Sequence, residues 1–104
     1  MSTHTPSELT YTDVPRENRV EARTPDGDLL GLVGYQRRGG ALVITHTEVG
    51  DAAAGHGVGS ALARFALDQA RTEGVPVVPL CPFVRAYVER HPEYADLVQE
   101  REHR

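Results

Sequence analysis

The chain has 104 residues, enough for one domain with one core, and carries 11 basic and 15 acidic residues for a net charge of −4. This balance leaves no basic footprint for nucleic acid, the single cysteine excludes an internal disulfide or a multi-thiolate zinc site, and the histidines show no metal-ligand spacing. No apolar run reaches the ~18 residues of a membrane helix and no signal peptide is evident, so we expect a cytoplasmic protein that binds no metal.

The N-terminal half is predicted to form antiparallel strands. Residues 1–10 are polar and are expected to be disordered, which leaves a single domain over residues 11–104. Turn signals at Asp26-Gly27 and Gly39-Gly40 predict two hairpins. They separate three segments with strand-like composition: residues 19–24, 29–36 and 41–49.

A helix is predicted after the third strand. Apolar residues recur at the helical spacing, Gly74 then provides a left-handed cap, and Pro76 follows the helix end. The predicted stripe consists of Val58, Leu62, Phe65, Ala66 and the polar Gln69.

The C-terminal segment predicts a strand and two further helices. The run "VPVVPL" is a short apolar strand whose prolines favour an edge position or an early end. Pro82 suits the first turn of a helix that stops before Pro92, where a last short helix begins. The second helix carries one stripe of Val84, Tyr87, Val88 and His91. The order of elements predicts an α/β domain of the α+β type with a mixed sheet and a strand–helix–strand crossover.

The stretch "GDAAAGHGVGSAL" is a glycine-rich link between the third strand and the first helix. A P-loop would need Lys and Ser or Thr where His56 and Gly57 stand, and the glycine spacing does not fit a dinucleotide-binding fold. A coenzyme A loop fits, because successive backbone N–H groups at a helix N-terminus bind a pyrophosphate. The alternative is that the glycines only form a tight turn. The candidate phosphate-binding residues are Gly55, His56, Gly57, Val58, Gly59 and Ser60.

The segment "GHGVGSALARFALDQAR" resembles the acetyl-CoA signature of the GNAT superfamily of N-acetyltransferases, Q/R-x-x-G-x-G/A. Gly57 and Gly59 match its glycines, whereas Ala54 departs from its Gln or Arg. Together with "ITHTEV" and "VPLCPFVRAYVERHPEY", it resembles the small single-domain GNAT-like group over about Arg19 to Val98. The resemblance implies a truncated GNAT-like acyl-CoA N-acyltransferase fold.

The resemblance also implies where the coenzyme lies. The strand "HTEV" would run beside the pantetheine arm, with Thr47 and Val49 as binding residues. Alternation places His46 and Glu48 together on the other face, where either is a candidate general base or a solvated side chain. Arg90 is a candidate for a coenzyme phosphate, with a solvated arginine as the alternative.

Cys81 is the third catalytic candidate. It stands between an apolar strand and a helix that begins at Pro82, and a helix N-terminus favours the thiolate. It could accept the acetyl group covalently or protonate the leaving thiolate, and the alternative is a small buried core residue.

The predicted activity is transfer of acetyl from acetyl-CoA to an amine. Only "PDGD" joins the first two predicted strands, where full GNAT domains carry two helices, so the acceptor side is expected to be open. An open side suits a large acceptor such as a protein amine. The alternatives are a coenzyme-binding module without turnover, acting as a sensor or subunit, and a structural domain without a ligand.

Overall fold

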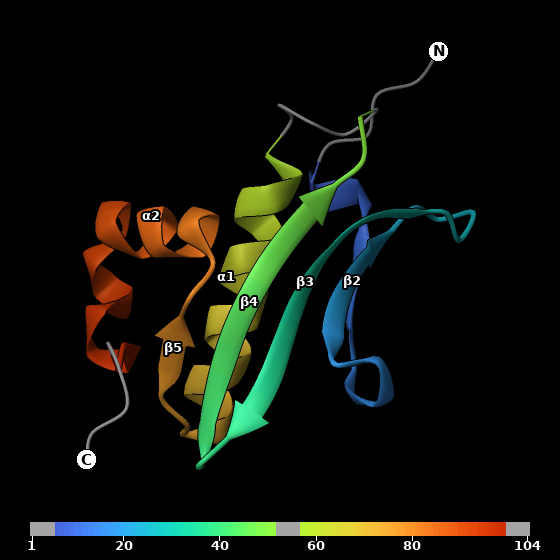
Figure 1. The fold of residues 1–104 in the computed structure, drawn as a ribbon. Helices are drawn as coiled ribbons and strands as arrows, with labels where there is room; N and C mark the ends of the chain where they lie inside the picture. Colours follow the sequence, from blue (N-terminus) through green and yellow to red (C-terminus); the bar gives the residue numbers. More distant parts are fainter. Residues whose placement is uncertain (1–5, 52–56, 100–104) are drawn as a thin grey trace.

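A five-stranded mixed sheet organises the protein, seen in a computed structural model that describes residues 6–51 and 57–99 (Figure 1). The strands lie in the sheet in the same order as in the chain. Neighbouring strands are antiparallel except for the last pair, which is parallel. The strands are β1 (Thr10–Val14), β2 (Arg19–Arg23), β3 (Leu29–Arg38), β4 (Ala41–Val49) and β5 (Val77–Pro79).

Two α-helices cover one face of this sheet. Helix α1 (Val58–Glu73) runs behind β4 in Figure 1 and connects it to β5, and helix α2 (Pro82–Arg90) follows β5. Both contribute to one core with the sheet, and the opposite face holds a smaller buried cluster of Ala41, Val43 and Val78. Three 3-10 turns complete the described chain: η1 (Pro6–Glu8), η2 (Pro15–Glu17) and η3 (Pro92–Leu97). The predicted mixed α/β sheet with a crossover is therefore confirmed.

The prediction that residues 1–10 are disordered is wrong for the last part of this segment. Within the segment expected to be disordered, η1 is formed and Leu9 is buried in the core. Strand β1 then pairs with β2 along its whole length, and the sequence analysis missed it. The reason is tertiary. Strand β1 is only half-buried and polar, and it is held by contacts with distant residues, such as Tyr11 stacking on Phe65.

Two other elements differ in detail from their predictions. Strand β5 spans three residues instead of six, and the last helix is a 3-10 helix. On α1 the buried stripe is wider than predicted and includes Ala63, Leu67 and Ala70, because α2 and η3 also pack against this helix. Gln69 lies at the edge of the core, where its amide donates a hydrogen bond of 2.8 Å to Asp13.

Asp13 also accepts a hydrogen bond of 2.5 Å from the buried Tyr35 hydroxyl. Burial first, and then the Asp13 carboxylate, raise the pKa of Tyr35 to about 12. The hydroxyl therefore stays protonated and ties β3 to β1 at any ordinary pH.

Gly31 of β3 lets α1 approach the sheet. A Cβ at this position would lie 2.9 Å from the Glu48 carbonyl oxygen and 3.1 Å from Leu62 Cδ1. Gly31→Ala should therefore lower the free energy of unfolding by about 1–3 kcal/mol, measured by urea denaturation. Gly50→Ala is the matched control, because among the described residues its Cβ would meet only the Leu30 carbonyl, at an ordinary 3.5 Å. Equal effects of the two changes would contradict the close approach of α1 at Gly31.

Candidate functional site

Strands β4 and β5 separate soon after they pair. Their ladder joins only Leu42–Ile44 to Val77–Pro79. It ends where the N–H groups of Leu80 and Cys81 both donate to the Ile44 carbonyl, each at 3.0 Å. The next residue, Pro82, has no N–H to continue the ladder and instead begins α2. The chain therefore turns away from β4 at this point.

Strand β4 continues beyond the separation, still paired with β3, as far as Val49. The Gly50 N–H donates to the Leu30 carbonyl of β3 at 2.8 Å. Because main-chain groups along a strand alternate in direction, those of Thr47 and Val49 point to the other side, where β5 has ended. No strand among residues 6–51 and 57–99 pairs with this edge of β4. The two predicted coenzyme-contacting residues therefore present an open strand edge.

A β-bulge in β4 sets this direction. Ile44 is opposite Tyr35 and His46 is opposite Gly34, so Thr45 is the extra residue. Ile44 faces β5 through its carbonyl, and strict alternation would continue with His46 and Glu48. The bulge shifts the phase by one residue, and Thr47 and Val49 face the gap instead.

Cys81 lies at the point of separation, on the face that the helices cover. Its side chain belongs to the core, with only 3% of the residue exposed. Its Sγ is 3.4 Å from Thr47 Oγ1 on β4. Cys81 is also the N-cap residue of α2. The structure thus brings two predicted site residues together across the gap.

His46 and Glu48 lie together on the opposite face of β4, as the alternation predicted, and both are exposed. Their side chains are 53% and 67% exposed, and His46 Nε2 is 3.4 Å from Glu48 Oε2. Neither α1 nor α2 covers this face of the sheet (Figure 1). The two candidate bases therefore face solvent, whereas Cys81 faces the core.

The N-terminus of α1 lies near the start of α2. Gly57 is its N-cap with φ of 86°, and as a glycine it has no side chain to cap the first turn. The N–H groups of Val58, Gly59 and Ser60 belong to this first turn, where helices lack internal acceptors. The Val58 side chain is part of the core, so only its main chain is available to a ligand. Gly55 and His56, two of the predicted phosphate-binding residues, lie outside the described residues.

Gly59 has a second role that the sequence analysis did not foresee. A Cβ at Gly59 would lie 2.9 Å from Phe83 Cζ, so the Phe83 ring of α2 rests on the first turn of α1. Phe83 is 39% exposed and Leu80 is 52% exposed, and they stand on either side of the buried Cys81. An apolar residue on each side of "CP" was the only signal in the sequence.

Arg90 does not join these residues. It is exposed at the C-terminal end of α2, whereas Phe83 is in the first turn of that helix, about 10 Å away along the axis. Tyr87, on the buried stripe of α2, stacks on His91 with ring centroids 3.9 Å apart, which agrees with the predicted packing role.

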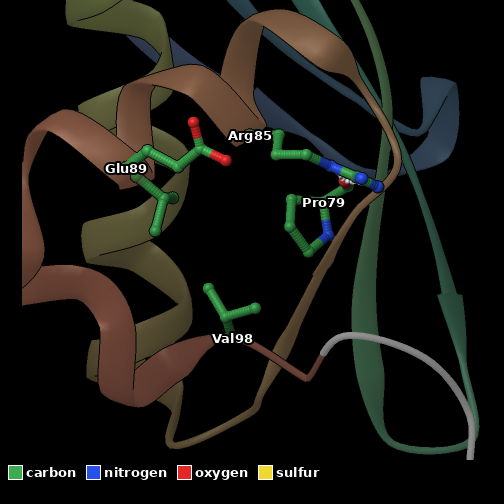
Figure 2. Close-up of a pocket in the computed structure, with 5 residues that line it drawn as sticks. Pro79, Arg85, Glu89 and Val98 are labelled. Carbon is green, nitrogen blue, oxygen red and sulfur yellow. Dashed lines mark hydrogen bonds between the residues drawn. The ribbon is translucent and has the colours of Figure 1, made fainter.

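Figure 2 shows a separate hollow of about 280 Å³ on the other side of β5. The Arg85 guanidinium donates to the Pro79 carbonyl there, through Nε at 3.3 Å and Nη2 at 3.2 Å. Its lining includes none of the candidate site residues: Pro79, Arg85, Val88, Glu89 and Val98. Arg85 thus satisfies a carbonyl on the side of β5 that faces away from β4.

One buried carboxylate on the open face is paired with two arginines. Arg23 and Arg19 bond the buried Glu21 carboxylate, each through Nε at 2.8 Å, and hold the pKa of Glu21 below its usual value. In the described part of the chain, no group of at least three His, Cys, Asp or Glu side chains is arranged to hold a metal ion. Among the described helices, none is both long and apolar enough to cross a membrane. The cytoplasmic location stays a prediction.

Comparison with known proteins identifies the family. A sequence profile described as GCN5-related N-acetyl-transferase matches residues 19–97, so the chain belongs to this family and the predicted GNAT-like membership is confirmed. The fold is similar to an NMR solution structure from Staphylococcus aureus, of a protein provisionally assigned as a GCN5-like N-acetyltransferase. The TM-score is 0.69 with 26% sequence identity, over 93% of this chain and 94% of that one. No curated protein matches the chain in sequence.

The contact between Gly59 and Phe83 should appear as an energetic coupling. Gly→Ala within a helix adds up to about 1 kcal/mol of stability, but at Gly59 the new Cβ meets the Phe83 ring. We expect little gain from Gly59→Ala alone and a gain of about 1 kcal/mol in the Phe83→Ala background, measured by urea denaturation. Glu73→Ala, at the other end of α1, is the control and should show no coupling to Phe83. Additive effects at Gly59 and Phe83 would argue against the contact.

Proposed function

We propose that the protein transfers the acetyl group of acetyl-CoA to an amine. One observation carries this proposal: in a chain of the GCN5-related family, Thr47 and Val49 lie on the strand before α1 and present main-chain groups that no strand of the described residues pairs with. The pantetheine arm of coenzyme A has two amides, and an extended polyamide pairs with an open strand edge as a further strand does. Acetyl-CoA is the proposed cosubstrate.

The N-terminus of α1 supports binding of the coenzyme pyrophosphate. The main chain can approach an anion closely at Gly57 and Gly59, and the first-turn N–H groups are free of intrahelical partners. We propose that Gly57, Val58, Gly59 and Ser60 bind through the main chain, and that Gly55 and His56, which precede them in the sequence, belong to the same binding motif. Arg90 is not included, because it lies at the other end of α2.

The two faces of β4 suggest a division of the chemistry. The acceptor amine approaches from the open face. As the amine nitrogen bonds to the acetyl carbon, His46 takes a proton from that nitrogen. The carbon–sulfur bond breaks, and the coenzyme thiolate takes a proton from Cys81 on the helix-covered face. The Cys81 thiolate then regains a proton from solvent. In a covalent route, Cys81 instead holds the acetyl group before the amine attacks.

The acceptor we propose is a large amine, such as a protein N-terminus or lysine. The face that carries His46 and Glu48 is not walled by α1 or α2 (Figure 1). The chain also has a net charge of −4, which favours a cationic amine over an acidic acceptor. A polypeptide therefore has room to lie across the open face.

Coenzyme binding is tested first. Acetyl-CoA should raise the free energy of unfolding by RT ln(1 + [L]/Kd), because it binds the native protein by mass action. The melting temperature should therefore rise. Gly57→Val should abolish the shift, because Gly57 has a φ of 86° and a β-branched side chain would also block the approach of the phosphates. His91→Gln, remote from the gap, is the control and should keep it. No shift for the wild-type protein at millimolar acetyl-CoA would end the proposal.

Turnover and the role of Cys81 are tested together. Free-thiol release with a set of peptide amines should show transfer, and Cys81→Ala should keep coenzyme binding but lose at least about tenfold in kcat. Intact-mass measurement after mixing with acetyl-CoA alone separates the routes, because only the covalent route adds an acetyl group to Cys81. Binding without release of thiol for any amine would instead favour a coenzyme-binding module.

A further inference from the structure

We propose that Thr45, the bulged residue of β4, fixes the tautomer of His46 so that Nε2 is the basic nitrogen. The inference deepens the proposed function, because it takes His46 as the base of acetyl transfer. It rests on the hydrogen bonds of the Thr45 hydroxyl and on the position of the His46 imidazole ring over Gly34. Thr45 is thus a positioning residue that acts through His46.

The Thr45 hydroxyl has two neighbours and a single proton. Its Oγ1 is 3.1 Å from the Gly34 carbonyl oxygen, which only accepts hydrogen bonds, so the hydroxyl proton is directed there. The same Oγ1 is 3.1 Å from His46 Nδ1. With its proton already used, the hydroxyl serves Nδ1 as an acceptor. Nδ1 therefore carries the ring proton in neutral His46.

The other ring nitrogen is left as the base. With Nδ1 protonated, Nε2 of the neutral ring has a free lone pair. Nε2 is 3.4 Å from Glu48 Oε2, so an imidazolium formed by proton uptake faces a carboxylate. The proton from the amine goes to Nε2, and Glu48 stabilises the resulting charge.

Gly34 holds the ring in this position. A Cβ at Gly34 would lie 2.8 Å from His46 Nδ1 and 2.9 Å from Nε2, so the imidazole lies directly over this glycine. The bulge contributes as well, because the extra residue brings the Thr45 hydroxyl to the Gly34 carbonyl and to Nδ1 at once. Gly34 and Thr45 therefore fix both the place of the ring and its tautomer.

The test reads the tautomer directly, by long-range proton–nitrogen NMR of the full-length protein with ¹⁵N-labelled histidine. His46→Gln assigns the His46 signals. Wild-type His46 should be the Nδ1–H tautomer when neutral. Thr45→Val, which keeps the shape but removes the hydroxyl, should shift the population toward Nε2–H. Thr45→Ser should restore Nδ1–H, and Thr12→Val on β1 is the matched control that should leave the spectrum unchanged.

Kinetics give the second measurement. Thr45→Val should lower kcat at least about tenfold and leave the KM for acetyl-CoA within about twofold, because the coenzyme contacts lie on the other edge of β4. Thr45→Ser should recover kcat. Gly34→Ala should give the same loss by displacing the ring, provided that its unfolding curve matches wild type.

Each result decides a separate point. A wild-type Nε2–H tautomer, or a Thr45→Val protein that keeps Nδ1–H, overturns the inference even if the enzyme is active. A tautomer that changes while kcat does not shows that His46 is not the base, which overturns the catalytic part. A wild-type protein that transfers acetyl to no amine refutes the proposed function. The NMR result still decides whether Thr45 sets the tautomer.

Discussion

The Ile44 carbonyl is the point on which the rest of the site depends. It accepts the N–H groups of both Leu80 and Cys81 and thereby closes the parallel ladder between β4 and β5. Pro82 then removes the next donor and starts α2. One carbonyl that accepts two hydrogen bonds and one missing N–H donor thus end the pairing of β5 with β4. Among the described residues, no strand then pairs with the far part of this β4 edge, and Cys81 lies where the two strands separate.

The bulge at Thr45 determines which main-chain groups of β4 face the gap. By adding one residue, it turns the main chain of Thr47 and Val49 toward the gap and leaves the side chains of His46 and Glu48 on the open face. The same extra residue places its hydroxyl between the Gly34 carbonyl and His46 Nδ1. A single insertion in the ladder therefore sets both the strand edge proposed to bind the coenzyme and the geometry of the candidate base.

The asymmetry of the sheet separates the two halves of the proposed reaction. Helices α1 and α2 bury one face and hold Cys81 against Thr47. The other face keeps the side chains of His46 and Glu48 in water, and on it two arginines pair with the buried Glu21 carboxylate. A buried thiol and an exposed imidazole on opposite faces of one strand are suited to different proton-transfer tasks. Phe83, resting on Gly59, joins the two helix N-termini beside them.

Local patterns in the sequence were sufficient for much of the fold. Turn residues located the hairpins, the helical period located α1 and α2, and Gly74 and Pro82 marked helix ends because these residues act within one turn of themselves. The alternation in "HTEV" correctly separated His46 and Glu48 from Thr47 and Val49. The motifs also indicated the family that the profile match confirms.

Contacts between distant residues decided the rest. Strand β1 has no strong period of its own and forms because Leu9, Tyr11 and Asp13 meet partners far along the chain. No local signal in the sequence indicated the bulge at Thr45 or the packing of the Phe83 ring on Gly59. Arg90 was a candidate phosphate ligand, but the structure places it at the C-terminal end of α2, away from the other site residues. The sequence by itself determined which residue types were available and which face of a strand or helix they occupy. Only the tertiary structure decided which of them meet, because register and packing depend on both partners of every contact.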